Sequence, residues 1–262
     1  MSAIHVLDDY YLAITALITV SYQLFFFAIA YTCNFDKLTD FAGGSNFIIL
    51  AITTLSLNHQ LVTTFFLITW AIRLTTFLLF RILKTGKDDC FDEMRQKFFP
   101  FLGFWVFQML WVWTVSLPVT VLNSPAVARY PQHRFGTGRD IAGLVMYSIG
   151  LGIETVSDAQ EYRFRRSHDG KAVCDGGLYA VSRYPNYFGE IPVHFAIYTI
   201  AVSSAAAGFV HGQAYKVLMP LSWAQSFSQF SSYSFLGYLS RNVQRQRHDM
   251  KATTIGKPIS AG

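Results

Sequence analysis

Apolar residues along this 262-residue chain fall in long runs instead of alternating with polar ones. A helix needs about 20 mostly apolar residues to cross the hydrocarbon core of a bilayer. Runs of this kind, or close to it, occupy residues 10–32, 45–57, 61–80, 98–122, 141–156, 188–210 and 214–239. The shortest run could be a tilted span or a re-entrant segment, and the last is rich in Ser and Gln. The pattern predicts an all-α polytopic membrane protein with about seven transmembrane helices, in a single membrane domain over residues 1–262.

The composition supports this class. Only 14% of the residues are charged while 52% are hydrophobic, whereas a soluble domain carries about 25% charged residues. The three cysteines have no metal-ligand spacing, and their odd number does not make a disulfide framework. These features exclude a disordered chain, a disulfide-stapled secreted module and a typical cytosolic enzyme.

The basic residues predict an orientation. With seven spans, most of the Lys and Arg residues fall in the loops 33–44, 81–97 and 157–187 and after residue 239. The positive-inside rule places these loops in the cytoplasm. The N-terminus is then lumenal or external and the C-terminus cytoplasmic, in the endoplasmic reticulum if the cell is eukaryotic. Because the basic residues flank spans, we expect them to contact anionic membrane lipids and not nucleic acid.

Arg73 is the most deeply placed cation within the predicted spans. Charged side chains in the hydrocarbon region cost about 2.5–3.5 kcal/mol on insertion scales, so they are candidates for function. Trp70, Arg73, Phe77, Arg81 and Lys84 follow one another at offsets of three and four, which places them on one helical stripe. Arg81 and Lys84 can snorkel to the interface. Arg73 lies too far from the helix end for that, which favours a functional role.

A second polar stripe leaves the membrane after the fifth run. Glu154, Asp158, Glu161 and Arg165 share one face of a helix. A solvated helix with an acid–arginine pair would explain the outer residues. Glu154 stands at the end of an apolar run, where a solvated carboxylate is not expected, and this favours a binding site.

The most informative segment runs from residue 176 to residue 190. Pro185 is suited to the first turn of a helix, and Asn186 and Glu190 then lie one turn apart on the same face. A carboxamide and a carboxylate at a membrane entry can hydrogen-bond an amide or a ribose while Arg183 binds a phosphate. Gly189 between them permits close approach by a partner or a ligand.

Two other polar positions lie in apolar surroundings. Residues 40–46 include Gly43 and Gly44 and predict a flexible turn that delivers Asn46, the candidate substrate contact, to the head of a short apolar segment. Of the seven histidines only His194 lies within a predicted span, where we favour a packing role over catalysis.

The run from Gly177 to Glu190, with Asp158, Asn46 and Arg73 upstream, resembles the steroid 5-alpha-reductase superfamily. The match is to its uncharacterised fungal and bacterial branch and covers about residues 40–201. A related element occurs more distantly in isoprenylcysteine carboxyl methyltransferases. Residues 217–262 do not match the basic, Tyr-containing segment with which the superfamily closes over its cofactor.

The resemblance implies a seven-helix bundle with a cytosol-facing NADPH site that reduces a carbon–carbon double bond conjugated to a carbonyl. Carried over position by position, it implies cofactor contacts at Arg73, Arg95, Glu154, Asp158, Arg165, Arg183, Asn186 and Glu190. Trp70 stands where the steroid enzymes have a carbonyl-polarising tyrosine, and its indole N–H can donate a hydrogen bond but cannot deliver a proton. Tyr187 is the candidate substitute, and no metal is implied.

Three functions therefore stay open. The first is an NADPH-dependent reductase of a lipid or sterol-like alkene. The second is an S-adenosylmethionine-dependent lipid or isoprenylcysteine-type methyltransferase, which the arginines fit less well because its cofactor carries a cationic sulfonium. The third is a non-catalytic membrane protein that retains the fold.

Overall fold

The computed structural model describes residues 7–33, 38–57, 61–85, 98–130, 133–167, 174–182 and 184–209. Within these residues the chain forms helices joined by turns, with no strand. The elements are α1 (Leu12–Thr32), α2 (Leu38–Leu57), α3 (Leu61–Thr85), α5 (Phe98–Leu122), α6 (Pro125–Ala128), α7 (Gly138–Ser167), the 3₁₀ turn η1 (Gly177–Ala180) and α8 (Pro185–Phe209).

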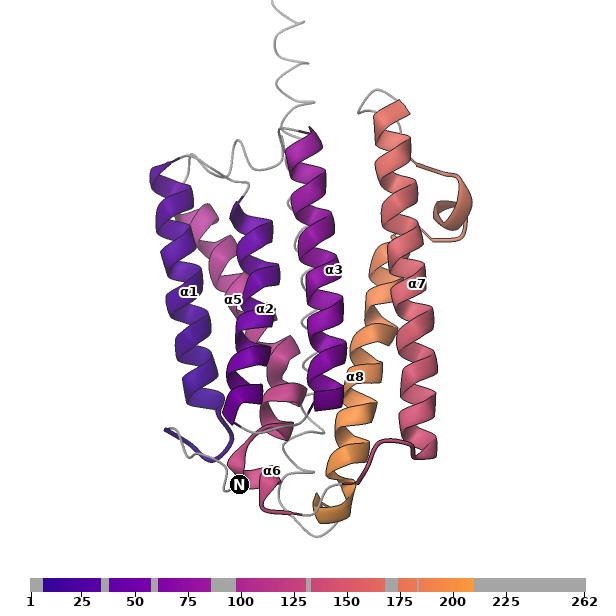
Figure 1. The fold of residues 1–262 in the computed structure, drawn as a ribbon. Coiled ribbons are helices and arrows are strands. Elements are labelled where there is room, and N and C mark those ends of the chain that lie inside the picture. Colours follow the sequence, from indigo (N-terminus) through magenta and orange to yellow (C-terminus); the bar gives the residue numbers. More distant parts are fainter. Residues whose placement is uncertain are drawn as a thin grey trace, which may run out of the picture.

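The long helices run up and down beside one another (Figure 1). The C-terminal ends of α1, α3 and α7 and the N-terminal ends of α2, α5 and α8 lie at one end of the bundle. The most extensive helix pair is α7 with α8, and α2 with α3 comes next. The main core joins both pairs through α5, and its buried members include Phe47, Leu67, Val112 and Val193.

Among the residues that the structure describes, three helices are long and apolar enough to cross a membrane: Leu12–Thr32, Leu61–Arg81 and Phe98–Ala128. Phe41–Leu55 is a shorter apolar helix. Large apolar side chains also lie exposed on the outside of the bundle, among them Leu17, Phe25, Phe65 and Leu110. Extended exposed apolar surface marks contact with a membrane or a partner. The described part of the chain is that of an all-helical membrane protein.

Most of the predicted runs correspond to helices. The run 98–122 has the bounds of α5, and α8 begins at Pro185 as predicted. The predicted turn at residues 40–46 is wrong, because these residues belong to a continuous α2. Gly44 serves packing there: a Cβ at this position would meet the Thr75 hydroxyl of α3. The run 214–239 and the segment 217–262 lie outside the described residues.

Candidate functional site

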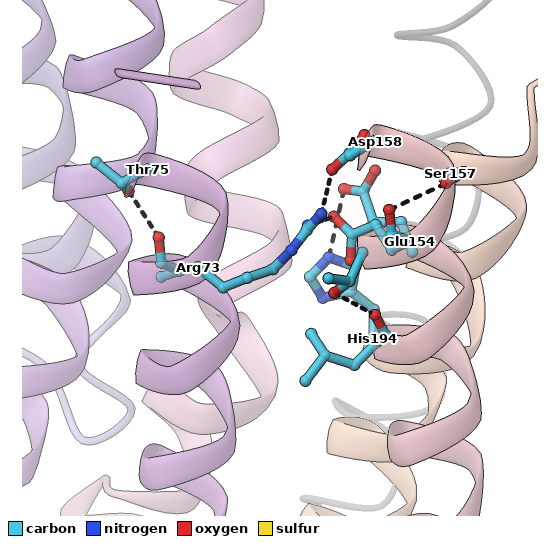
Figure 2. A network of polar contacts seen from close by, with 10 residues as sticks. Arg73, Thr75, Glu154, Ser157, Asp158 and His194 are labelled. Atoms are coloured by element: carbon cyan, nitrogen blue, oxygen red, sulfur yellow. Dashed lines mark hydrogen bonds and ion pairs between the residues drawn. The ribbon is translucent and has the colours of Figure 1, made fainter. Parts of the chain in front are cut away.

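Arg73 joins α3 to α7 through an ionic bridge. Its Nη1 donates a hydrogen bond to Oε1 of Glu154, and its Nη2 donates one to Oδ2 of Asp158. The two carboxylates lie four residues apart, so one face of α7 presents both of them to α3. Figure 2 shows the guanidinium reaching across to this face. The side chains of Arg73, Glu154 and Asp158 are only 17%, 4% and 9% exposed, so the bridge is largely withdrawn from solvent.

Helix α8 adds two buried ionisable side chains next to this bridge. Glu190 and His194 are 7% and 2% exposed and lie one helical turn apart, with His194 Nε2 3.5 Å from Glu190 Oε1. The imidazole lies beside the Arg73 bridge in Figure 2. We call Arg73, Glu154, Asp158, Glu190 and His194 the ionic cluster. Helices α3, α7 and α8 contribute to it, and α3 is distant in sequence from the other two.

Two glycines bring α7 and α8 together at this level. A Cβ on Gly150 would lie 2.6 Å from the carbonyl oxygen of Gly189, and a Cβ on Gly189 would lie 2.7 Å from the backbone nitrogen of Glu154. Real Cβ atoms do not approach backbone so closely, so both positions require glycine. The predicted close approach at Gly189 therefore has a partner, which is α7. This contact sets Glu154 beside α8.

Tyr147 holds α7 against α3 below the ionic bridge. Its hydroxyl donates a hydrogen bond of 2.9 Å to the carbonyl oxygen of Phe66, and the two rings pack with centroids 4.7 Å apart. On α3 the guanidinium of Arg73 lies over the ring of Phe77 at 5.9 Å, which confirms that these two residues share a stripe.

Several buried polar atoms around the ionic cluster have no hydrogen-bond partner among the residues that the structure describes. They are Glu154 Oε2, Trp70 Nε1, both ring nitrogens of His194, and Asn186 Oδ1. Buried polar groups in folded proteins are nearly always paired, because an unpaired one retains its desolvation cost. Such atoms gathered in one region are typical of a site that a bound molecule or ordered water completes.

Trp70 lies at the apolar side of the ionic cluster. It is fully buried, its ring meets that of His194 edge to face at 4.3 Å, and Phe47 of α2 packs against it at 5.1 Å. Asn46, the predicted substrate contact, is also fully buried, and within the described part of the chain neither of its amide atoms has a hydrogen-bond partner. The structure therefore places Trp70 next to the ionic cluster. Asn46 directly precedes Phe47, the residue that packs on Trp70.

The outer part of α7 carries a different kind of pair. Arg165 contacts Glu161 at 2.6 Å with its own side chain 73% exposed, so this predicted cofactor contact is a surface ion pair in the structure. The hydroxyl of Tyr179 in η1 donates to Glu161 at 3.2 Å. Burial, together with the negative charge of Glu161, raises the pKa of Tyr179.

Of the remaining predicted site residues, two are described by the structure and two are not. Tyr187 lies in the first turn of α8 with its ring stacked on that of Tyr184 at 5.5 Å. Asn186 is half-buried beside it. Arg95 and Arg183 lie outside the described residues. Among the described residues no group of His, Cys, Asp and Glu side chains is arranged to hold a metal ion.

The fold and this cluster define the class of the protein, an all-helical membrane protein with a buried ionic cluster between α3, α7 and α8. The chain belongs to the family described as "Protein of unknown function (DUF1295)", whose match covers residues 26–230. No curated protein and no solved structure matches the chain.

Proposed function

We propose that this chain is a membrane-embedded reductase that uses NADPH to reduce a carbon–carbon double bond in a lipid or sterol-like substrate. The observation that supports the proposal is the ionic cluster, with unpaired polar atoms beside it, in the interior of an apolar bundle. Ionisable residues within membrane helices are expensive and mark functional sites. Four of its residues are also ones to which the superfamily resemblance assigns cofactor contacts: Arg73, Glu154, Asp158 and Glu190.

The same proposal includes a membrane topology of about seven spans with a cytoplasmic C-terminus. Helices α2, α7 and α8 would join α1, α3 and α5 as spans, and the remaining predicted run, 214–239, lies outside the described residues. The up-and-down order of the described helices supports this arrangement. Arg81, Lys84, Arg163, Arg165 and Arg166 then mark one end of the bundle as cytoplasmic, where NADPH is available.

The residues present fit a dinucleotide. Glu154 Oε2 and Asn186 Oδ1 are buried acceptors without donors, and the ribose hydroxyls and the carboxamide of NADPH are donors. The cations needed for its phosphates stand further out, where Arg163 and Arg166 are exposed at the C-terminal end of α7. Acceptors in the bundle and cations at its rim match the two ends of such a molecule.

When bound, NADPH supplies a hydride. The chain's own residues would orient the cofactor. Arg73 fixes the rotamers of Glu154 and Asp158, so that Oε2 of Glu154 would be held in one position to accept a hydrogen bond from the cofactor. The apolar and aromatic residues around Trp70 exclude water from the reacting face.

The test is a titration of the purified full chain with NADPH, followed by the fluorescence of the nicotinamide. We expect a saturable change that Glu190→Gln abolishes, because this buried carboxylate lies beside the unpaired acceptors. Asp9→Asn, which alters an acidic residue of the surface pair Asp9–Arg129 elsewhere in the bundle, serves as the control and should leave the response intact. No response at millimolar NADPH would refute the reductase.

One observation favours the methyltransferase as the second candidate. The ionic cluster contains three carboxylates and a single guanidinium, and a surplus of buried acid suits the cationic sulfonium of S-adenosylmethionine. Isothermal titration of the same preparation with NADPH and with S-adenosylmethionine distinguishes the two candidates. A bound nucleotide without turnover across a lipid panel would instead favour a non-catalytic protein.

A further inference from the structure

Glu161, at the outer end of α7, is held from two sides. Its Oε1 accepts a hydrogen bond of 2.9 Å from Nε of Arg165 and lies 2.6 Å from Nη2 of the same guanidinium. Its Oε2 accepts a hydrogen bond of 3.2 Å from the hydroxyl of Tyr179. The side chain of Glu161 is only 24% exposed, whereas that of Arg165 is 73% exposed. A partner from a second segment therefore fixes the carboxylate against Arg165, which an ordinary surface pair four residues apart lacks.

The segment that carries Tyr179 is itself attached to α7. The side-chain oxygen of Gln160, the neighbour of Glu161, accepts a hydrogen bond of 3.0 Å from the backbone N–H of Leu178. Gly177 has a φ of +63°, and a Cβ at this position would lie 2.6 Å from the amide nitrogen of Gln160. The turn η1 thus lies directly against α7, and Tyr179 reaches Glu161 from a position that these contacts define.

The contact occupies the part of Arg165 that an anion would use. Nε and Nη2 form one edge of the guanidinium, and such an edge binds carboxylate or phosphate oxygens side on. Arg163 and Arg166 are exposed at the same end of α7, where the phosphates of a ligand would find cations. Glu161 therefore takes one edge of a third cation in this region and cancels its charge.

We infer that Glu161 is an internal competitor for phosphate: in the ligand-free chain it occupies Arg165, and a phosphate must displace it to bind there. A phosphate monoester carries close to two negative charges near neutral pH, against one on a carboxylate or a phosphodiester. A monoester can therefore win this competition most readily. As a statement about a cofactor this rests on the proposed function, whose preference for a phosphorylated ligand it would explain.

The test measures dissociation constants by isothermal titration of the full chain in phosphatidylcholine nanodiscs, with two matched pairs of probes. NADPH, whose 2′-phosphate is a monoester, is compared with NADH. Dihexanoylphosphatidic acid, a lipid monoester, is compared with dihexanoylphosphatidylglycerol. We expect Glu161→Gln to tighten binding of the monoester of at least one pair about tenfold. Its partner should gain only about threefold, because a single negative charge is repelled half as strongly by Glu161.

Asp175→Asn is the matched control, because it removes an exposed carboxylate from the segment that leads into η1. It should change each affinity less than twofold. In a chain that already carries Arg165→Gln, the change Glu161→Gln should give no gain, since the two residues act on one another. A merely structural pair would alter thermal stability and leave these affinities unchanged.

The inference is overturned if Glu161→Gln tightens neither monoester, or tightens monoester and partner equally. It is also overturned if Asp175→Asn gives the same gain, or if the gain persists without Arg165. The lipid pair contains no nucleotide, so it separates the two proposals. A gain for phosphatidic acid in a chain that ignores NADPH refutes the reductase and keeps the phosphate site.

Discussion

Helix α7 carries buried carboxylates in two places, at its start and further along, and they are paired in different ways. At its start, Asp140 accepts hydrogen bonds from the backbone N–H groups of Gly136 and Thr137, and the hydroxyl of Thr137 in turn accepts from the N–H of Asp140. Further along, Glu154 and Asp158 are held by Arg73 of another helix, 81 and 85 residues away in the sequence.

This difference in pairing distinguishes a carboxylate that caps a helix from carboxylates that belong to a candidate functional site. The Thr137–Asp140 arrangement is a capping box, in which neighbours satisfy the helix start. Ser203 of α8 lies 2.7 Å from the Thr137 hydroxyl and ties this cap to the next helix. At the ionic cluster the groups come from three helices, and buried atoms stay unpaired. Pairing between distant helices, next to buried polar atoms without hydrogen-bond partners among the described residues, therefore distinguishes the candidate site from the cap of the same helix.

The largest effect should come from breaking the ionic bridge. Arg73→Ala leaves Glu154 and Asp158 buried without a cation, and removing one partner of a buried pair costs about 3–5 kcal/mol. We expect the free energy of unfolding, measured by denaturation with SDS in mild detergent, to fall by that amount. The triple variant Arg73→Met, Glu154→Gln, Asp158→Asn should recover most of it because no charge stays buried.

The exposed pair on the same helix provides the contrast. Arg165→Ala should change stability by no more than about 1 kcal/mol, because a surface pair is screened by solvent. Equal losses for Arg73→Ala and Arg165→Ala would show that the bridge is not buried in the way described.

The next effect concerns the helix contact beneath the site. Gly189→Ala adds a methyl group that meets the backbone of Glu154 and Gly150, which cannot move aside, and overpacking costs about 1–3 kcal/mol. Gly152→Ala is the matched control, since nothing lies within 4 Å of its Cβ position. Replacing a helical glycine by alanine should stabilise the control by about 0.5–1 kcal/mol. Thermal unfolding of both variants in detergent measures the two stability changes. Equal changes would show that α7 and α8 do not meet at Gly189.

The smallest effect belongs to the cap. Burial alone would raise the pKa of Asp140, but the N–H groups of Gly136 and Thr137, with hydroxyls of Ser203 and Thr137, outweigh it and lower the pKa. A lowered folded-state pKa gives stability that is present above about pH 4, the unfolded value, and lost as the pH falls through the folded value. Asp140→Asn should cost about 1 kcal/mol at pH 7.

This cost should disappear in acid. Stability curves of the wild type and Asp140→Asn, recorded between pH 7 and pH 3, should converge at the low end. Curves that stay parallel would mean that the carboxylate charge does not contribute to the cap.

The sequence predicted where the helices lie along the chain better than it predicted which helices contact one another. The run 98–122 has the bounds of α5, because its composition is apolar throughout. The glycines at 43 and 44 indicated a turn, yet they lie inside α2, because small size at a helix contact outweighs their low helix propensity. Local pattern cannot tell a glycine that bends a chain from one that lets two helices meet.

The site was predicted in part. Offsets of four placed Glu154 and Asp158 on one face, and the depth of Arg73 in its run marked it as functional. Periodicity does not say which helix faces which, so the pairing of Arg73 with those acids required the structure. The same is true of His194: its apolar neighbours predicted packing, and only the structure shows its Nε2 at 3.5 Å from Oε1 of Glu190 in the ionic cluster.

The distance in sequence between Arg73 and its carboxylates affects how the protein is made. The ribosome delivers α3 to the membrane about 80 residues before the acids of α7 emerge. Until then the nascent chain holds an uncompensated cation in an apolar segment, at a cost of about 2.5–3.5 kcal/mol. The bridge that compensates this cation can therefore form only after both α3 and α7 have been synthesised.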